Sequence, residues 1–166
     1  SRERLIQIGE LPSHVFNYGS LGVENVLSLK LLSESEIRKE LGLSSARPIM
    51  VATFHPETRG DQAGVDQVEI LLRGLDLFLE DYDIVFTGAN MDPDGDQINQ
   101  TLRSFSEVNP GAFLFGNLGV HRYLSLVKSS SVVVGNSSSG VIEVPSLGVP
   151  VVNIGKRQKG RERSSD

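Results

Sequence analysis

Short apolar runs alternate along this chain with segments of helical spacing. The runs are nonpolar at nearly every position, and turn residues bound each of them. Continuous runs of this kind are typical of strands buried on both faces, as in a parallel sheet. The six predicted strands span residues 14–18, 49–54, 84–87, 112–115, 131–134 and 149–154.

The segments between the runs predict helices. Residues 64–80 carry apolar side chains three or four positions apart, which makes one stripe on a helix. Ser33 and Glu36 match the capping-box pattern of a helix start, and Gly42 supplies the stop. Further helices are expected over 22–29, 96–108, 120–128 and 138–147. Because parallel neighbours need helical crossovers, the alternation predicts an α/β domain with a doubly wound parallel sheet.

The composition of the chain excludes several classes of function. The 166 residues carry 16 Lys+Arg against 21 Asp+Glu, a net charge of −5, which disfavours nucleic acid as a partner. The chain contains no cysteine, so thiol catalysis and thiolate metal sites are excluded, and a reducing cytoplasm is a compatible location. No apolar run approaches the about 18 residues of a membrane helix, so no membrane partner is expected.

The most informative segment is Gly-Asn-Ser-Ser-Ser-Gly at 135–140, directly after the fifth predicted strand. Ligands of open parallel sheets bind outside the carboxyl ends of the strands. Hydroxyls and unpaired N–H groups at a helix start suit a phosphate, although serine is also a common N-cap. Three serines in succession, Ser137–Ser139, favour the phosphate interpretation.

Familiar cofactor motifs are absent. The 135–140 segment is not a G-x-G-x-x-G dinucleotide fingerprint, because no two glycines lie two positions apart. It is not a Walker A loop, because Val141 follows it in place of Lys-Ser/Thr. The acidic stretch 90–96 lacks the full calcium-loop pattern, so a solvated turn is expected there. No metal and no cofactor is therefore predicted.

Three charged or titratable residues lie near predicted strand ends. Glu143, four positions after the last serine, could accept two ribose hydroxyls or could be a surface residue stabilised by the helix dipole. His55 follows the second strand and precedes Pro56; it could donate to a diphosphate or move a proton, although lone histidines are often structural. Arg157 can offer a planar fork to a phosphate.

The cationic tail 156–166 is expected to be mobile. Its residues are charged or small and bury little apolar surface, so ordering is expected only with nucleotide and a partner domain. Arg157 is expected to be its most ordered cation, bridging toward the 137–139 loop.

Three sequence blocks carry a family resemblance: V-A-T-F-H-P-E-T at 51–58, the segment 135–155, and R-Q-K-G-R at 157–161. With them the chain resembles the hydrolysing UDP-N-acetylglucosamine 2-epimerases of bacterial sialic-acid biosynthesis. The resemblance implies a GT-B architecture of two Rossmann-like domains. Residues 1–166 resemble the second, UDP-binding domain, and the N-terminal domain is the missing partner within the same protein. The chain starts without methionine, and we expect it to be part of a longer enzyme.

The resemblance also assigns roles to residues. Ser137 and Ser138 would hold the diphosphate of UDP or UDP-GlcNAc, Glu143 the ribose, and Arg157 a phosphate. His55 would be a catalytic residue at the diphosphate and sugar. Asn90 and the main chain near Leu118 would flank the nucleoside.

The implied reaction converts UDP-GlcNAc to N-acetylmannosamine and UDP by elimination and hydration, in a full-length homo-oligomer whose acid and base lie in the other domain. The fragment alone would bind without turnover. Two alternatives stay open: a GT-B glycosyltransferase using a UDP-sugar donor, which R-Q-K-G-R disfavours, and a regulatory α/β module, which would need acidic strand ends. The sequence leaves open whether the sugar is the N-acetyl or the 2,4-diacetamido compound.

Overall fold

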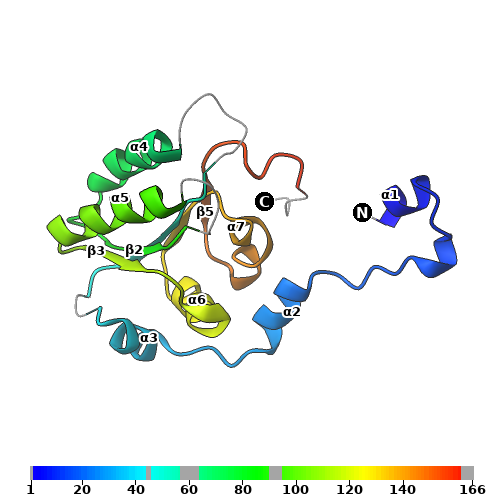
Figure 1. The fold of residues 1–166 in the computed structure, drawn as a ribbon. Coiled ribbons are helices and arrows are strands. Elements are labelled where there is room, and N and C mark those ends of the chain that lie inside the picture. The colour runs from blue at the N-terminus through cyan, green and yellow to red at the C-terminus, as the bar shows by residue number, and fades with distance from the viewer. Residues whose placement is uncertain (1, 44–45, 57–63, 90–94, 162–166) are drawn as a thin grey trace.

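The computed structural model describes residues 2–43, 46–56, 64–89 and 95–161. Its strands within these ranges form one parallel sheet in the order β3-β2-β1-β4-β5 (Figure 1). The chain winds outward from β1 in one direction through β2 and β3, and in the other through β4 and β5. The doubly wound parallel sheet is therefore confirmed, with its switch point between β1 and β4. The strands are β1 (Ile49–Thr53), β2 (Asp83–Thr87), β3 (Ala112–Phe115), β4 (Val132–Gly135) and β5 (Val151–Asn153).

Helices cover both faces of the sheet. In Figure 1, α4 and α5 lie on one side of the strands and α3, α6 and α7 on the other. The α-helices are α1 (Arg2–Gln7), α2 (Leu21–Ser28), α3 (Glu34–Leu41), α4 (Gly64–Asp76), α5 (Gly95–Val108), α6 (Gly119–Lys128) and α7 (Ser139–Ile142). Two short 3₁₀ helices, η1 (Pro12–His14) and η2 (Pro145–Leu147), complete the described elements.

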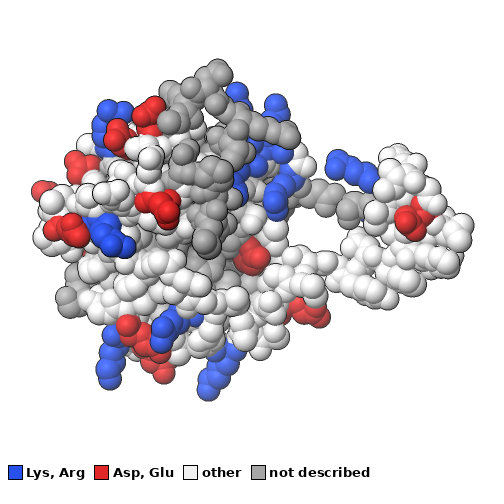
Figure 2. All heavy atoms as spheres, viewed as in Figure 1, with Lys and Arg blue, Asp and Glu red and all other residues white. Residues whose placement is uncertain are grey.

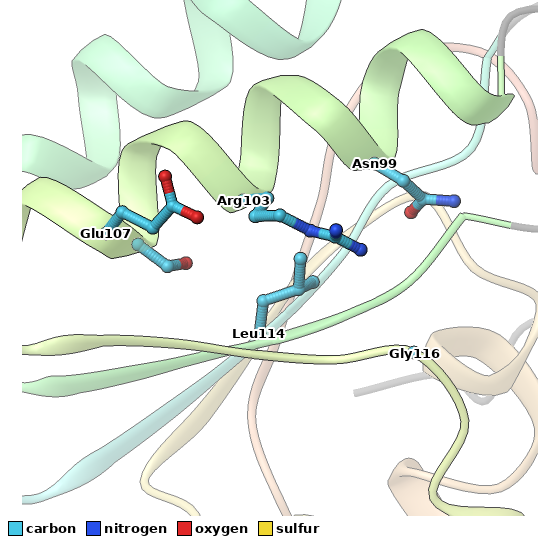
Figure 3. A pocket seen from close by; sticks show the side chains of 6 residues that line it. Asn99, Arg103, Glu107, Leu114 and Gly116 are labelled. Carbon is cyan, nitrogen blue, oxygen red and sulfur yellow. The ribbon is translucent and has the colours of Figure 1, made fainter.

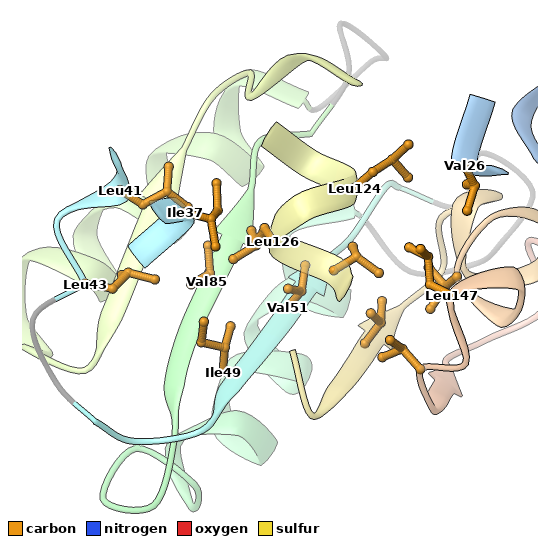
Figure 4. Packing of buried hydrophobic residues seen from close by; sticks show 14 residues of the cluster. Val26, Ile37, Leu41, Leu43, Ile49, Val51, Val85, Leu124, Leu126 and Leu147 are labelled. Carbon is orange, nitrogen blue, oxygen red and sulfur yellow. The ribbon is translucent and has the colours of Figure 1, made fainter. Parts of the chain in front are cut away.

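Alternate residues of β1 to β4 supply two separate cores. Ile49 and Val51 of β1 point to the α3 and α6 side, where Ile37 and Leu126 are fully buried (Figure 4). Met50 of β1 points to the opposite side and packs with buried residues of α4 and α5. Because the inner strands β1 and β2 are buried on both faces, their sequences show no polar alternation.

The predicted capping box is confirmed. The Ser33 hydroxyl accepts the Glu36 N–H at 3.4 Å, and the Glu36 carboxylate accepts the Ser33 N–H at 2.8 Å. Gly42 ends α3 with a φ of 66°, a left-handed conformation that glycine adopts without strain.

The prediction of a first strand at 14–18 is wrong. His14 ends η1, and Phe16 and Tyr18 are 67% and 90% exposed, with their rings stacked 5.8 Å apart. An apolar run forms a strand only when it pairs with another strand. This run lies between α1 and α2, on the N-terminal segment that extends away from the sheet (Figure 1).

Two predicted helices end early. The helix expected over 138–147 is split into α7 and η2, because Pro145 has no N–H to continue the α-helical ladder. The helix expected over 64–80 ends at Asp76 and continues as turns.

Candidate functional site

The strand register brings the predicted site segments together. Thr53 at the end of β1 pairs with Thr87 of β2 and with Gly135 of β4. A cavity of about 490 Å³ opens at these carboxyl ends. Its lining consists of Thr53, His55, Thr87, Gly88, Ala89, Gly116, Asn117, Leu118, Gly119, Val120, Tyr123, Ser137 and Ser139. His55, Leu118 and Ser137, which the sequence places far apart, thus share one cavity at the switch point.

Gly135 makes the close approach of β4 to β1 possible. Its φ is 141°, and a Cβ at this position would collide with the carbonyl oxygen of Thr53. A side chain here would push the serine loop, Ser137–Ser139, away from β1. The glycine that precedes the serines is therefore required by the backbone geometry.

Asn136 fastens the loop to His55. The Asn136 side chain is fully buried; its Oδ1 accepts the His55 N–H at 2.8 Å and its Nδ2 donates to the His55 carbonyl at 2.7 Å. Both bonds use the backbone of His55, and His55 also lines the larger cavity. Sequence reasoning missed Asn136, because a buried asparagine and a loop asparagine look alike in sequence.

The start of the tail docks on the same residue. Gln158, only 1% exposed, donates from Nε2 to the Asn136 carbonyl at 2.7 Å, and Arg157 donates to the same oxygen at 3.3 Å. The tail is expected to dock only with nucleotide and a partner domain; in its described part, 156–161, Arg157 and Gln158 instead bond to Asn136 of their own domain. Arg157 reaches Asn136, the residue directly before the 137–139 loop toward which a bridge is predicted.

Basic side chains concentrate at this docked segment. Figure 2 shows blue side chains gathered where Figure 1 draws the red C-terminal segment, whereas both charges are mixed over the rest of this face. The described cations of the segment are Lys156, Arg157, Lys159 and Arg161. Although the chain is acidic overall, this edge of the site offers positive charge to an anion.

Glu143 lines a second, smaller cavity of about 200 Å³. Its carboxylate lies against the start of α2, where a Cβ at Gly22 would collide with Oε1. The lining consists of Gly22, Asn25, Val120, Tyr123, Leu124, Ser138, Ser139 and Glu143. Ser138, predicted to hold the diphosphate together with Ser137, thus lines the cavity of Glu143, whereas Ser137 lines the larger cavity.

The two cavities adjoin, because Val120, Tyr123 and Ser139 line both. The Tyr123 hydroxyl, the Ser139 hydroxyl and Oε2 of Glu143 are buried without a hydrogen-bond partner among the described residues. Buried polar atoms without partners are costly, and a ligand with its own donors and acceptors would satisfy them. Sequence reasoning missed Tyr123, which reads as an ordinary apolar position of α6.

One predicted residue is not placed. Asn90 lies outside the described residues, although its neighbours Gly88 and Ala89 line the larger cavity. A third hollow of about 380 Å³ lies between α5 and the edge strand β3 (Figure 3). It is lined by Asn99, Arg103 and neighbouring residues, and it contains none of the predicted site residues.

The described ranges contain neither a metal-binding cluster nor a membrane-spanning helix. No group of three or more His, Asp or Glu residues there is arranged to hold a metal ion. None of the helices described is long and apolar enough to cross a membrane.

Comparison with known proteins identifies the family to which this chain is similar. A model of the UDP-N-acetylglucosamine 2-epimerase family matches residues 1–166. Polysialic acid biosynthesis protein P7 of Escherichia coli is 42% identical over 164 residues, which cover 99% of this chain and 41% of that protein. GDP/UDP-N,N'-diacetylbacillosamine 2-epimerase (hydrolyzing) of Campylobacter jejuni is 37% identical, over 99% of this chain and 43% of that protein.

Solved structures share the fold. The UDP-GlcNAc 2-epimerase of Neisseria meningitidis, solved bound to UDP-GlcNAc, superposes with a TM-score of 0.66 at 13% identity, over 92% of this chain and 41% of that chain. The predicted Rossmann-like fold of GT-B enzymes is thereby confirmed. The chain spans about two fifths of the length of the curated relatives it matches. With its whole length matched by the family model, this chain belongs to the UDP-N-acetylglucosamine 2-epimerase family.

Proposed function

We propose that this chain is the UDP-binding part of a hydrolysing UDP-N-acetylglucosamine 2-epimerase. The observation that carries the proposal is the arrangement of the serine loop, His55 and Glu143 around two adjoining cavities at the switch point of the sheet. An anion-binding loop in one cavity and a carboxylate in the adjoining cavity suit the diphosphate and the ribose of a nucleoside diphosphate.

The larger cavity suits the diphosphate. Ser137 and Ser139 line it with hydroxyls, and His55 enters from the end of β1. Arg157 approaches from the tail, with its guanidinium 3.3 Å from the Asn136 carbonyl. Charge-assisted hydrogen bonds from such groups are stronger than neutral ones and are worth about 1.5–3 kcal/mol each before the costs of immobilisation.

The smaller cavity suits the ribose. Glu143 presents a buried carboxylate oxygen that has no partner among the described residues. A carboxylate accepts hydrogen bonds only, so its natural ligand is a pair of hydroxyl donors such as the ribose 2′,3′-diol. The main chain near Leu118, and Asn90 outside the described residues, are proposed to flank the base.

The proposed reaction has two steps. A base removes the proton from C2 of the sugar, the C1–O bond to UDP breaks, and a C1=C2 double bond forms. Water then adds across that bond to give N-acetylmannosamine with C2 inverted. We assign the acid and base to the domain outside this chain, and His55 to the leaving diphosphate.

Three further proposals concern the whole enzyme. Its second domain is this chain, 1–166, paired with an N-terminal domain across a cleft. It is a homo-oligomer, which light scattering of the full-length protein tests, and it acts in the cytoplasm, which cell fractionation tests.

Full-length protein incubated with UDP-GlcNAc should release UDP and N-acetylmannosamine in equal amounts. A parallel reaction with the UDP-linked 2,4-diacetamido sugar identifies the preferred substrate. Release of N-acetylglucosamine without inversion at C2, or transfer of the sugar to an acceptor, would contradict the proposal. Calorimetry on the 166-residue chain should show UDP binding more tightly than uridine, and equal binding would count against the diphosphate site.

A further inference from the structure

Tyr123 stands where the two cavities meet. It projects from α6, and it lines both the cavity that contains Ser137 and the cavity that contains Glu143. A ligand with its phosphates in the first and its sugar hydroxyls in the second must pass this side chain. The bond between ribose and phosphate would therefore lie beside Tyr123.

The tyrosine hydroxyl is buried and makes no hydrogen bond of good geometry among the described residues, although the Ser139 and Thr53 hydroxyls lie near it. Two neighbours share this state, the Ser139 hydroxyl and Oε2 of Glu143. A buried phenol usually finds a partner, since desolvating an unpaired hydroxyl is unfavourable. Three such groups around one junction indicate a ligand that supplies the missing partners.

The phenol is a neutral donor at physiological pH. Burial raises the pKa of Tyr123; the neighbouring Ser139 hydroxyl lowers it, the Glu143 carboxylate raises it and the Thr53 hydroxyl lowers it, by decreasing amounts, and the net shift is upward. The hydroxyl therefore keeps its proton and can donate it to an anion. Glu143, which accepts only, cannot make that contact with a phosphate.

We propose that Tyr123 is a specificity-determining residue whose hydroxyl donates a hydrogen bond to the phosphate attached to the ribose. The side chain thereby selects nucleotides over nucleosides, in addition to the serine loop. This inference rests on the proposed function, because it presumes that the diphosphate and the ribose occupy the two cavities.

The test removes one oxygen atom. In the 166-residue chain, Tyr123→Phe should lower the affinities for UMP and for UDP by the same factor of about ten, which corresponds to about 1.4 kcal/mol. The affinity for uridine, measured by NMR titration, should stay unchanged. Tyr82→Phe is the matched control; Tyr82 stacks edge-on against Phe78, outside both cavities, and its variant should bind all three ligands like the wild type.

A stability measurement separates binding from packing. Since no residue in the described part of the chain forms a well-aligned hydrogen bond with this hydroxyl, Tyr123→Phe should unfold at the same or a higher urea concentration without nucleotide. A clear loss of stability would assign the hydroxyl a structural role and overturn the proposal.

Other outcomes are equally decisive. Unchanged UMP and UDP affinities in Tyr123→Phe, with normal wild-type binding, would overturn the role of Tyr123 alone. A loss for UDP but not UMP, or a loss that includes uridine, would place the contact elsewhere on the ligand and also overturn it. Failure of the wild-type chain to bind UDP would instead overturn the proposed function and this inference with it.

Discussion

Asn136 holds both backbone polar groups of His55, accepting its N–H at 2.8 Å and donating to its carbonyl at 2.7 Å. The pair joins the end of β1 to the loop after β4, the two segments that face each other across the switch point of the sheet. The same asparagine receives Gln158 and Arg157 of the tail on its main-chain oxygen. One buried residue thus connects the histidine through its side-chain amide and the tail through its main-chain carbonyl.

Replacing this amide should be costly. Asn136→Asp puts a carboxylate oxygen against the His55 carbonyl and leaves both acceptors without a donor, so the free energy of unfolding should fall by about 3 kcal/mol. Urea unfolding measures the change. Asn109→Asp is the control, because Asn109 is only half-buried and donates one bond, to Phe105 at 2.9 Å. A similar loss in both variants would argue against the role of the Asn136 side chain in joining β1 to the loop after β4.

The His55 imidazole should matter for turnover more than for folding. Since Asn136 binds backbone atoms that alanine retains, His55→Ala should leave Tm within a few degrees. In the full-length enzyme, kcat/KM should fall at least about tenfold, roughly 1.4 kcal/mol of transition-state stabilisation. His121→Ala, which loses a contact of 2.9 Å to Lys30 outside both cavities, should retain kcat/KM. A collapsed melting transition in His55→Ala would make the histidine structural.

Gly22 should be required for binding and not for stability. A methyl group there displaces the Glu143 carboxylate, so Gly22→Ala should weaken UDP binding in calorimetry. Because alanine is the better helix former by roughly 0.5–1 kcal/mol, α2 itself should not be destabilised. Gly74→Ala in α4, where a Cβ meets no atom within 4 Å, should leave UDP affinity unchanged. Undiminished UDP affinity in Gly22→Ala would show that Glu143 does not need its observed position.

The amino end of the sheet depends on a buried carboxylate. Asp83 at the start of β2 is fully buried, with Arg47 2.9 Å and Arg38 3.6 Å away. Asp83→Asn removes the charge that both guanidiniums face, and we expect a loss of about 3 kcal/mol in urea unfolding. Glu40→Gln, in the exposed pair with Arg122, should cost less than about 1 kcal/mol. Equal effects would mean that burial adds nothing to the Asp83 interaction.

The α3 capping box should give stability that depends on pH. The Ser33 side chain and backbone, through their hydrogen bonds, lower the pKa of Glu36 below its usual 4.5. The stabilisation is therefore complete above the unfolded pKa of 4.5 and is lost as the pH falls through the lower folded value. Ser33→Ala should cost about 1 kcal/mol at pH 7, and the difference from wild type should shrink below pH 4.5. Ser104→Ala on exposed α5 surface should show no such pH dependence; a constant difference in Ser33→Ala would refute the coupling.

Local sequence determined the elements and the chemistry at their ends. The run 49–54 is apolar at every position except Thr53 because both faces of its strand are covered, and this pattern can be recognised without knowing the neighbouring strands. The capping box involves only the four residues from Ser33 to Glu36, so it can also be predicted from local sequence. Ser137, Ser138, Glu143 and His55 could be singled out because parallel strands present their carboxyl ends at one edge of the sheet.

Only the tertiary structure decided which of these groups meet and what supports them. The bond between His55 and Asn136 joins residues 81 positions apart, and neither local spacing nor propensity contains that information. Tyr123 became a site residue because α6 packs where the two cavities join. The run at 14–18 failed to become a strand for the same reason, since strand formation depends on a partner supplied by the rest of the chain.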